Sequence, residues 1–314
     1  MATTALGHTG ALSRFTVAAV AAALVATGTD AVAADAPGNA SKAREAASRL
    51  AESRPAAQAP AARSASTASA PTVEHRYLYG ISGATLYEYR PDGRGGYGPR
   101  AFWDRDWDYY RNAAQVNNDG DANADDAWLW SVYGELFYIS SEAPYVYIGG
   151  GWNIYNKVIS PGSLGGAASA DLIARDGSGK LWLYLGHSDG KLTGRTLIGT
   201  GWNIYSHISG YGDLTGDGRA DIVTTDKSGV LWLHPGSGDY KKPFNARIKI
   251  GGGWNTFTYL AGVADLDLDG KNDIIARDKA GALYRYSGTG SARAPFKPKV
   301  KIGTGGWNTY RVLF

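Results

Sequence analysis

The chain has 314 residues, no cysteine and a formal net charge of +3, from 32 Lys and Arg against 29 Asp and Glu. The lack of cysteine excludes disulfides, thiol catalysis and Cys-based zinc sites, and the near balance of charge gives no sign of a nucleic-acid-binding face. Glycine is abundant at 43 residues and aromatic residues make up 12%, which is typical of short strands joined by tight turns.

Residues 1–34 are predicted to be a signal peptide. Arg14 supplies a positive charge, residues 15–26 form an apolar run, and Ala31–Ala33 offers the small residues that a signal peptidase needs. The run is too short to span a bilayer comfortably, although an uncleaved membrane anchor is the alternative. We expect a secreted, extracellular protein with no membrane span in its mature form.

Residues 35–72 are predicted to be a disordered linker or pro-segment. The stretch is rich in Ala, Ser, Pro and Arg and contains no aromatic residue. Such a composition cannot bury enough apolar surface to offset the entropy lost on ordering. The aromatic-rich domain is therefore expected to span residues 73–314.

This domain is built from a repeat. The motif Gly-Trp-Asn occurs four times, with its tryptophans at 152, 202, 254 and 307, and a weaker copy contains Trp107. Between consecutive Gly-Trp-Asn motifs, the pattern predicts two strands joined by a Gly-bearing turn and then a third strand. The segment directly after each motif predicts a fourth strand. Four short strands per unit of about 50 residues are typical of a β-propeller blade. We predict an all-β fold, a five-bladed β-propeller.

The two ends of the domain are expected to complete one blade together. Residues 76–93 match the middle of a unit but lack the strand that should precede them, and "GWNTYRVLF" at the C-terminus is a first strand with nothing after it. Pairing the two would close the ring in a velcro closure and remove two exposed strand edges.

The loop before the second strand of each unit is a candidate calcium site. Calcium takes about six to eight oxygen ligands, and a Gly within the loop permits the sharp turn. The ligands in the fifth unit would be Asp265, Asp267, Asp269, Asp273 and the carbonyl of Lys271; in the fourth, Asp213, Thr215, Asp217, Asp221 and the carbonyl of Arg219; and in the second, Asn117, Asp119, Asp121 and Asp125.

The third unit has "SLGGAASAD" in the same place, residues 163–171, with only its last carboxylate, and should bind no ion. The alternative for all of these loops is a set of Asx-type turns without a metal. Clustered carboxylates repel one another when no cation is bound, so we favour Ca²⁺ as a structural cofactor.

The loop pattern followed by "DIIARD" resembles the FG-GAP (VCBS) repeat, the calcium-bearing blade of integrin-type propellers, over residues 117–290. A second resemblance is to tachylectin-type lectins. It rests on "KIGTGGWNTYRVLF" at the C-terminus and "YLYGISGATLYEYRPDG" near residue 77. That family is a five-bladed propeller with sites for N-acetylated sugars between blades, so this resemblance implies a carbohydrate ligand.

The Gly-Trp-Asn turns are candidate sugar sites. A sugar site usually combines an aromatic face with fixed polar groups, and the turns repeat both around a ring. The candidates are Trp152, Asn153, Trp202, Asn203, Trp254, Asn255, Trp307 and Asn308. Packing between blades is the alternative role for the tryptophans, and turn formation for the asparagines.

We expect no enzymatic activity. The chain has no Gly-x-Ser-x-Gly elbow, Walker loop or His-Glu-x-x-His motif. Three hypotheses follow: a lectin-like module that binds an extracellular or cell-surface glycan, a propeller that binds a protein partner, and an extracellular glycoside hydrolase. The first is favoured, with the protein as a monomer and no nucleic-acid partner.

Overall fold

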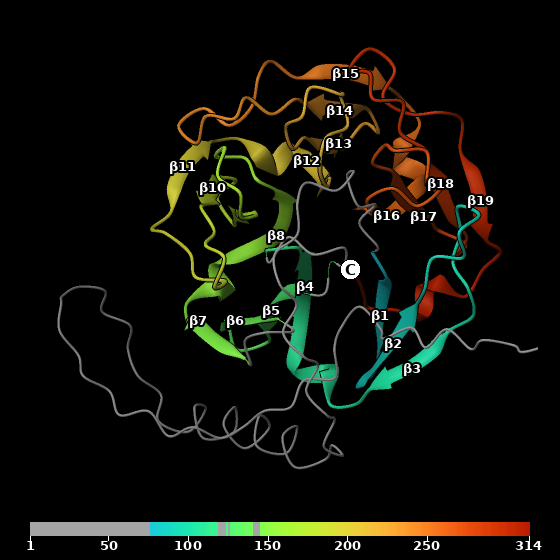
Figure 1. Cartoon of the computed structure of the whole chain (residues 1–314), viewed down its shortest axis with the longest axis horizontal. Helices are drawn as coiled ribbons and strands as arrows, with labels where there is room; N and C mark the ends of the chain where they lie inside the picture. Colours follow the sequence, from blue (N-terminus) through green and yellow to red (C-terminus); the bar gives the residue numbers. More distant parts are fainter. Residues whose placement is uncertain (1–75, 119–123, 125, 141–144) are drawn as a thin grey trace, which may run out of the picture.

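The computed structural model describes residues 76–118, 124, 126–140 and 145–314. Within these residues the chain is a five-bladed β-propeller (Figure 1), which confirms the predicted fold. The expected signal peptide at 1–34 and linker at 35–72 lie outside the described residues. In the described ranges, no helix has the length and apolar character needed to cross a membrane.

Each blade is an antiparallel sheet of four strands, and one strand of each sheet lies next to the central axis (Figure 1). From the axis outward, blade 1 contains β20 (Val312–Leu313), β1 (Leu78–Ser82), β2 (Thr85–Tyr89) and β3 (Ala101–Asp104). Blade 2 contains β4 (Tyr110–Val116), β5 (Asp126–Ser131), β6 (Leu136–Ile139) and β7 (Val146–Gly149). Blade 3 contains β8 (Tyr155–Gly162), β9 (Asp171–Asp176), β10 (Leu181–Tyr184) and β11 (Thr196–Gly199). Blade 4 contains β12 (Tyr205–Ser209), β13 (Ile222–Asp226), β14 (Leu231–His234) and β15 (Ile248–Gly251). Blade 5 contains β16 (Phe257–Gly262), β17 (Ile274–Asp278), β18 (Leu283–Tyr286) and β19 (Val300–Gly303).

The ring is closed by β20, as predicted. This strand pairs with β1 in the register Gly80↔Leu313, and Tyr79 and Phe314 exchange two backbone hydrogen bonds of 2.8 and 3.0 Å. Their rings also stack, with centroids 5.5 Å apart. The inner edge of blade 1 is thereby paired instead of exposed.

The hydrophobic core lies between neighbouring blades, because successive side chains of a strand point to opposite faces of its sheet. In β9, Leu172 and Ala174 join a cluster with Trp128 of blade 2. Ile173 joins a different cluster that contains Ile208 of blade 4. Each blade therefore packs on two neighbours, and no blade buries its core alone.

Short 3₁₀ turns connect consecutive blades, and each begins with the repeated tryptophan. They are η1 (Trp107–Tyr109), η2 (Trp152–Ile154), η3 (Trp202–Ile204), η4 (Trp254–Thr256) and η5 (Trp307–Thr309). The amide of Trp202 donates to the carbonyl of Gly179, in the hairpin of the preceding blade, at 2.8 Å. Gly179 has φ +82°, and a Cβ there would lie 2.9 Å from Cγ of Asn203. The glycine is required by both its backbone angle and this close approach.

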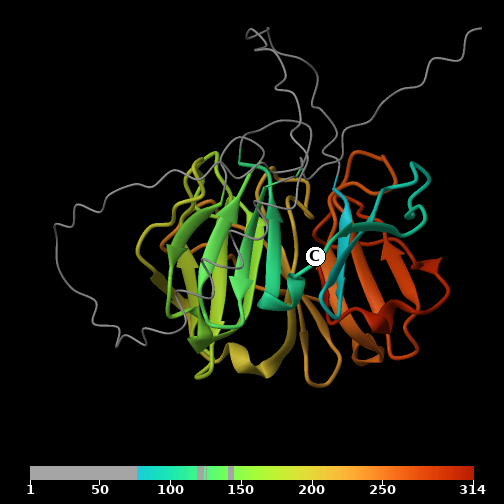
Figure 2. The same cartoon turned by 90° about the horizontal axis from the view of Figure 1, so that it is seen from below.

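The strands run between two faces of the disc (Figure 2). The tryptophan-turn face carries η1–η5 and the hairpins between the second and third strands of each blade. The acidic-loop face carries the loops between the first and second strands, including 163–170, 210–221 and 263–273. Since the strands are antiparallel, the loops predicted to hold calcium and the turns predicted to hold sugar lie on opposite faces.

Candidate functional site

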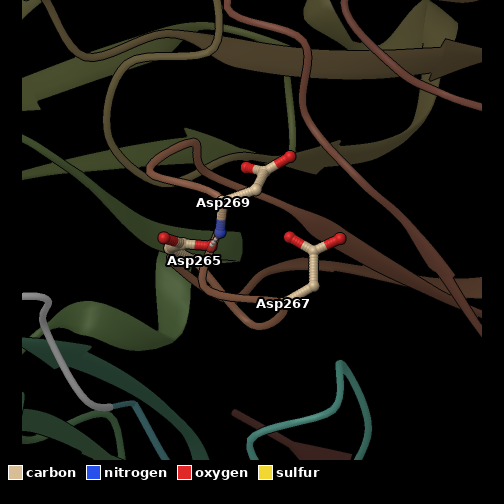
Figure 3. A group of neighbouring side chains, drawn as sticks. All are labelled: Asp265, Asp267 and Asp269. Carbon is tan, nitrogen blue, oxygen red and sulfur yellow. Dashed lines mark hydrogen bonds between the residues drawn. The ribbon is translucent and has the colours of Figure 1, made fainter.

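The acidic loop of blade 5 brings three carboxylates together. Asp265, Asp267 and Asp269 each offer an oxygen, and these oxygens lie within 4.8 Å of one another (Figure 3). The loop is shaped by Asp265, whose carboxylate accepts hydrogen bonds from the amides of Asp269 at 3.0 Å and Gly270 at 2.6 Å. The arrangement offers the hard oxygen ligands that a divalent cation such as Ca²⁺ takes.

Two basic side chains already contact this cluster. Arg285 lies 3.1 Å from Asp267, and Nζ of Lys297 lies 2.6 Å from Asp269. The hydrogen bond to Asp269 raises the pKa of Lys297. Oδ1 of Asp267 is buried and accepts no hydrogen bond within the described part of the chain. One buried oxygen of the cluster is therefore still available to an ion.

The last aspartate of the loop in blades 4 and 5 accepts hydrogen bonds from backbone amides. Asp273 accepts from the amides of Leu266 at 3.1 Å and Gly288 at 2.8 Å. Asp221 accepts in the same way from Leu214 at 2.8 Å and Gly236 at 2.7 Å.

Burial raises the pKa of both carboxyls, to about 7 for Asp273 and about 6 for Asp221. The negative charge of Asp267 adds to the effect at Asp273.

Asp171 of blade 3 makes the same contacts although its loop has no other carboxylate. It accepts from the amides of Leu164, Gly165 and Gly186 at 2.8 to 3.0 Å, and it is fully buried. Blades 3, 4 and 5 share the contacts at the positions of Leu164 and Gly186. The aspartate at this position therefore organises the backbone of the blade whether or not the loop has ligands for an ion.

In blade 4, Asp213 and Asp217 also shape their own loop. Asp213 accepts from the amides of Thr215, Gly216 and Gly218 at 2.7 to 2.9 Å, and Asp217 accepts from the amide of Arg219 at 3.0 Å. Among the described residues, only the loop of blade 5 brings three acidic groups within 4.8 Å. The calcium prediction for blade 4 therefore rests on sequence alone.

In blade 2, the predicted ligands Asp119, Asp121 and Asp125 lie outside the described residues, while Asn117 is half-buried. The alignment of this blade needs a correction of one residue. Gly134 bonds to the turn of Trp152 as Gly179 bonds to that of Trp202, so the equivalent of Asp171 is Asp126. This residue is 1% exposed and accepts from the amide of Asn118 at 3.0 Å. The equivalent residue therefore lies one position after Asp125, the residue predicted from the sequence.

The tryptophans of the Gly-Trp-Asn turns pack between aromatic neighbours. Trp152, Trp254 and Trp307 are 6 to 8% exposed, and Trp202 is half-buried. The facing ring is Tyr184 for Trp152, His234 for Trp202, Tyr286 for Trp254 and Tyr89 for Trp307, with centroids 4.5 to 5.0 Å apart. The structure thus shows a packing role for these indoles.

The asparagines of the same turns are exposed on the tryptophan-turn face. They are Asn153, Asn203, Asn255 and Asn308. Nδ2 of Asn308 donates to the carbonyl of Lys279 in the preceding hairpin at 3.0 Å. These side chains are the accessible polar part of the turns, and ligand binding by them stays a prediction.

Comparisons with known proteins agree with this architecture. The FG-GAP-like repeat family matches residues 168–224 and 213–276, which contain the acidic loops of blades 4 and 5. No curated protein matches the chain.

The solved structures to which the chain is similar include the following two. The BP39L lectin of Burkholderia pseudomallei is 15% identical, with a TM-score of 0.45, over 75% of this chain and 72% of the lectin. AofleA of Arthrobotrys oligospora is 9% identical, with a TM-score of 0.41, over 76% of this chain and 75% of that chain. The chain described here contains FG-GAP-like repeats in a five-bladed β-propeller.

Proposed function

We propose that the protein is a secreted, calcium-stabilised binding module whose ligand is a carbohydrate. The observation that supports calcium is the cluster of Asp265, Asp267 and Asp269, since the backbone of blade 3 folds in the same way without these carboxylates. An ion would relieve the repulsion within the cluster and engage the buried Oδ1 of Asp267.

The support for a carbohydrate ligand is the repetition of one exposed polar group on a single face. Four asparagines occupy equivalent turns around the tryptophan-turn face. Several weak, equivalent sites on a rigid ring suit the multivalent display of sugars, where avidity exceeds the affinity of any one site. The tachylectin-type resemblance of the sequence directs the proposal to N-acetylated sugars.

The absence of enzymatic activity is part of this proposal. Of the glutamates outside the acidic loops, Glu88 is 1% exposed and pairs with Arg90 at 2.7 Å. Glu135 accepts hydrogen bonds from Tyr109 and Ser131. Both side chains have structural partners, which favours a binding role over the paired, solvent-facing carboxylates that glycoside hydrolysis needs.

Recognition of a protein partner is the second candidate, because apolar side chains are exposed on the tryptophan-turn face. Val132, Tyr133 and Ile154 are 47, 48 and 51% exposed. The hairpin at Gly134 and the turn at Trp152 are joined by a hydrogen bond, so these side chains come from adjacent segments. Such a patch is compatible with a protein ligand.

A glycan array on the full chain, with calcium and then with a chelator, tests the proposal. We expect binding to N-acetylated sugars that falls when Asn203→Ala and Asn255→Ala are combined. The control is Asn245→Ala, on the opposite face, where the amide bonds to the carbonyl of Gly236. A blank array from a folded protein that calcium stabilises would overturn the carbohydrate assignment and favour a protein ligand.

A further inference from the structure

Near the tryptophan-turn face, five basic residues line the central cavity, lie within two positions of a residue that lines it, or pair with one across the sheet. They lie at or just before the start of the inner strands, or at the paired end of the second strands, and they come from four of the five blades. They are Arg111, Lys157, Arg175, Arg277 and Arg311. We call this group the cation ring.

The four arginines share a contact that crosses the blade junctions. Arg175 donates from Nη1 to the carbonyls of Trp202 at 3.0 Å and Tyr205 at 2.6 Å, both in the connection to the next blade. Arg277 donates in the same way to Trp307 and Tyr310, at 2.9 and 3.2 Å.

Arg311 reaches the carbonyl of Trp107 at 2.6 Å, and Arg111 reaches that of Tyr155 at 3.5 Å. Arg175 and Arg277 come from second strands, whereas Arg111 lies in the inner strand β4 and Arg311 directly precedes the inner strand β20. Two different sequence positions therefore place a guanidinium at equivalent points of the ring.

Blade 4 has no arginine at this place. Ser206 and Thr225 occupy the two positions, and the hydroxyl of Ser206 donates to the carbonyl of Thr225 at 3.0 Å. His207 lies beside them in β12. The nearby positive charge of Lys157 contributes to lowering its pKa, although burial is the larger cause.

The charge of the cation ring is not balanced by acidic neighbours. Within the described residues, no carboxylate lies within 4.0 Å of any of its members. Asp108 acts on Arg311 from a greater distance. The carbonyl partners satisfy N–H donors but carry no net charge, so the positive charges remain to attract an anion.

Lys157 is the member without a partner. It makes no hydrogen bond or ion pair in the part of the chain that the structure describes, and burial, followed by the charge of Arg175, lowers its pKa to about 8. Lys157 lines a cavity of about 80 Å³ on the axis, together with Asn112, Ser160 and Ser209. A lysine held in this way is ready to donate three hydrogen bonds to an incoming oxyanion.

We propose that the cation ring and the axial cavity beside Lys157 form a binding site for an oxyanion group, such as sulfate or phosphate. Guanidinium and ammonium donors match the oxygens of such groups, and an anion would offset the repulsion between Lys157 and the neighbouring Arg175. The site is distinct from the asparagine turns, and the proposal does not depend on sugar binding by those turns.

The oxyanion can be a free ion or a group on a larger ligand. The cavity is small, so it accepts one sulfate-sized group and leaves the remainder of a larger ligand on the surface around the exposed Arg111 and Arg311. A sulfated oligosaccharide would contact both parts, whereas inorganic sulfate would contact the cavity alone.

Titration calorimetry with sodium sulfate, against sodium chloride at matched ionic strength, tests the site on the full chain. We expect saturable sulfate binding that Lys157→Gln weakens at least tenfold, while Lys249→Gln on the outer strand β15 leaves it unchanged. If Lys157→Gln does not fold, Arg111→Gln serves instead, because Arg111 is exposed and makes one long hydrogen bond. The proposal is overturned if sulfate does not bind. It is also overturned if sulfate binds equally to the wild type and to whichever of Lys157→Gln and Arg111→Gln folds.

A second arm separates the two sources of the anion. A sulfated disaccharide that binds more tightly than inorganic sulfate, and more tightly than its desulfated form, indicates a group on a larger ligand. Equal affinity for the disaccharide and for inorganic sulfate indicates a site for the free ion. Loss of both in Lys157→Gln, with glycan-array binding through the asparagine turns intact, would show that the two sites are independent.

Discussion

Blades 3 and 4 have nearly the same length and backbone, yet they differ at three points that the repeat makes comparable. The loop of blade 3 has Ala167 where blade 4 has Asp217. The ring that faces the turn tryptophan is Tyr184 in blade 3 and His234 in blade 4. Arg175 in β9 is matched by Thr225 in β13.

What stays constant between the two blades indicates what the fold requires. Asp171 and Asp221 both accept buried amides from the start of their own loop and from the loop after the third strand. The other loop carboxylates are present in blade 4 and absent from blade 3, and these backbone contacts are the same in both blades. The last aspartate therefore serves the fold, and the additional ones are free to serve an ion.

The largest expected effect comes from removing that shared aspartate. Asp171→Ala leaves two buried amides and one half-buried amide without an acceptor, and Asp221→Ala leaves at least two buried amides. We expect each variant to lose about 3 kcal/mol of unfolding free energy or more, measured by urea denaturation. The losses should be similar with and without calcium. A loss of unfolding free energy below about 1 kcal/mol for Asp171→Ala would contradict the inference that the shared aspartate is required by the fold.

The second prediction concerns the ring that faces the turn tryptophan. Burial, and then the charge of Arg247, lowers the pKa of His234 from 6.5 to about 4. The folded state therefore disfavours the protonated ring, so the stability that this residue contributes is present above pH 6.5 and is lost as the pH falls towards 4. The loss should reach up to about 3 kcal/mol.

His234→Tyr, which copies Tyr184, should remove this part of the pH dependence. The measurement is the unfolding free energy of both proteins at a series of pH values from 7 to 4. Subtracting one curve from the other cancels the titration of the carboxylates. Parallel curves would contradict the assignment of the pH dependence to His234.

The third prediction makes the loop of blade 4 resemble that of blade 3. At a calcium concentration about 100-fold above Kd, one bound ion should stabilise the fold by about 2.7 kcal/mol. Asp217→Ala should reduce the calcium-induced rise in Tm, as should Asp267→Asn in blade 5. Asp217 is exposed, so its variant should match the wild type in chelator, and Ser163→Ala in blade 3 serves as the control. An undiminished calcium response would place the ion outside blade 4.

The smallest expected effect is at the blade junctions. Arg175→Thr copies the residue of blade 4 and removes the bonds to the carbonyls of Trp202 and Tyr205. We expect a loss of about 1 to 2 kcal/mol, since the carbonyls become accessible to water near the mouth of the axis. Lys180→Thr, in the exposed hairpin of the same blade, is the control. Equal stability of Arg175→Thr and wild type would show that the junction needs no arginine.

The sequence was sufficient for the number of blades, the closure of the ring and the place of the acidic loops, because the repeat fixes all three. It was not sufficient for contacts between blades. Arg175 and Arg277 occur in the same short motif, "ARD", but their carbonyl partners lie about 30 residues later. Nor did it separate Asp125 from Asp126, because adjacent residues exchange faces with a shift of one in register.

The packing of the turn tryptophans also depended on the structure. Their periodicity is equally consistent with a row of sugar platforms and with a row of wedges between blades. The deciding observation is that each indole faces an aromatic ring at the end of the third strand. That pairing joins residues about 30 positions apart, which no local pattern specifies.

The closure by β20 also determines the order in which the molecule can be completed during synthesis. The outer three strands of blade 1 emerge first, but their inner partner is made roughly 200 residues later. Until then the inner edge of β1 has free backbone groups. A nascent chain that stalls before Val312 would carry four whole blades and one open edge, and it would be the form most exposed to aggregation and to quality-control proteases.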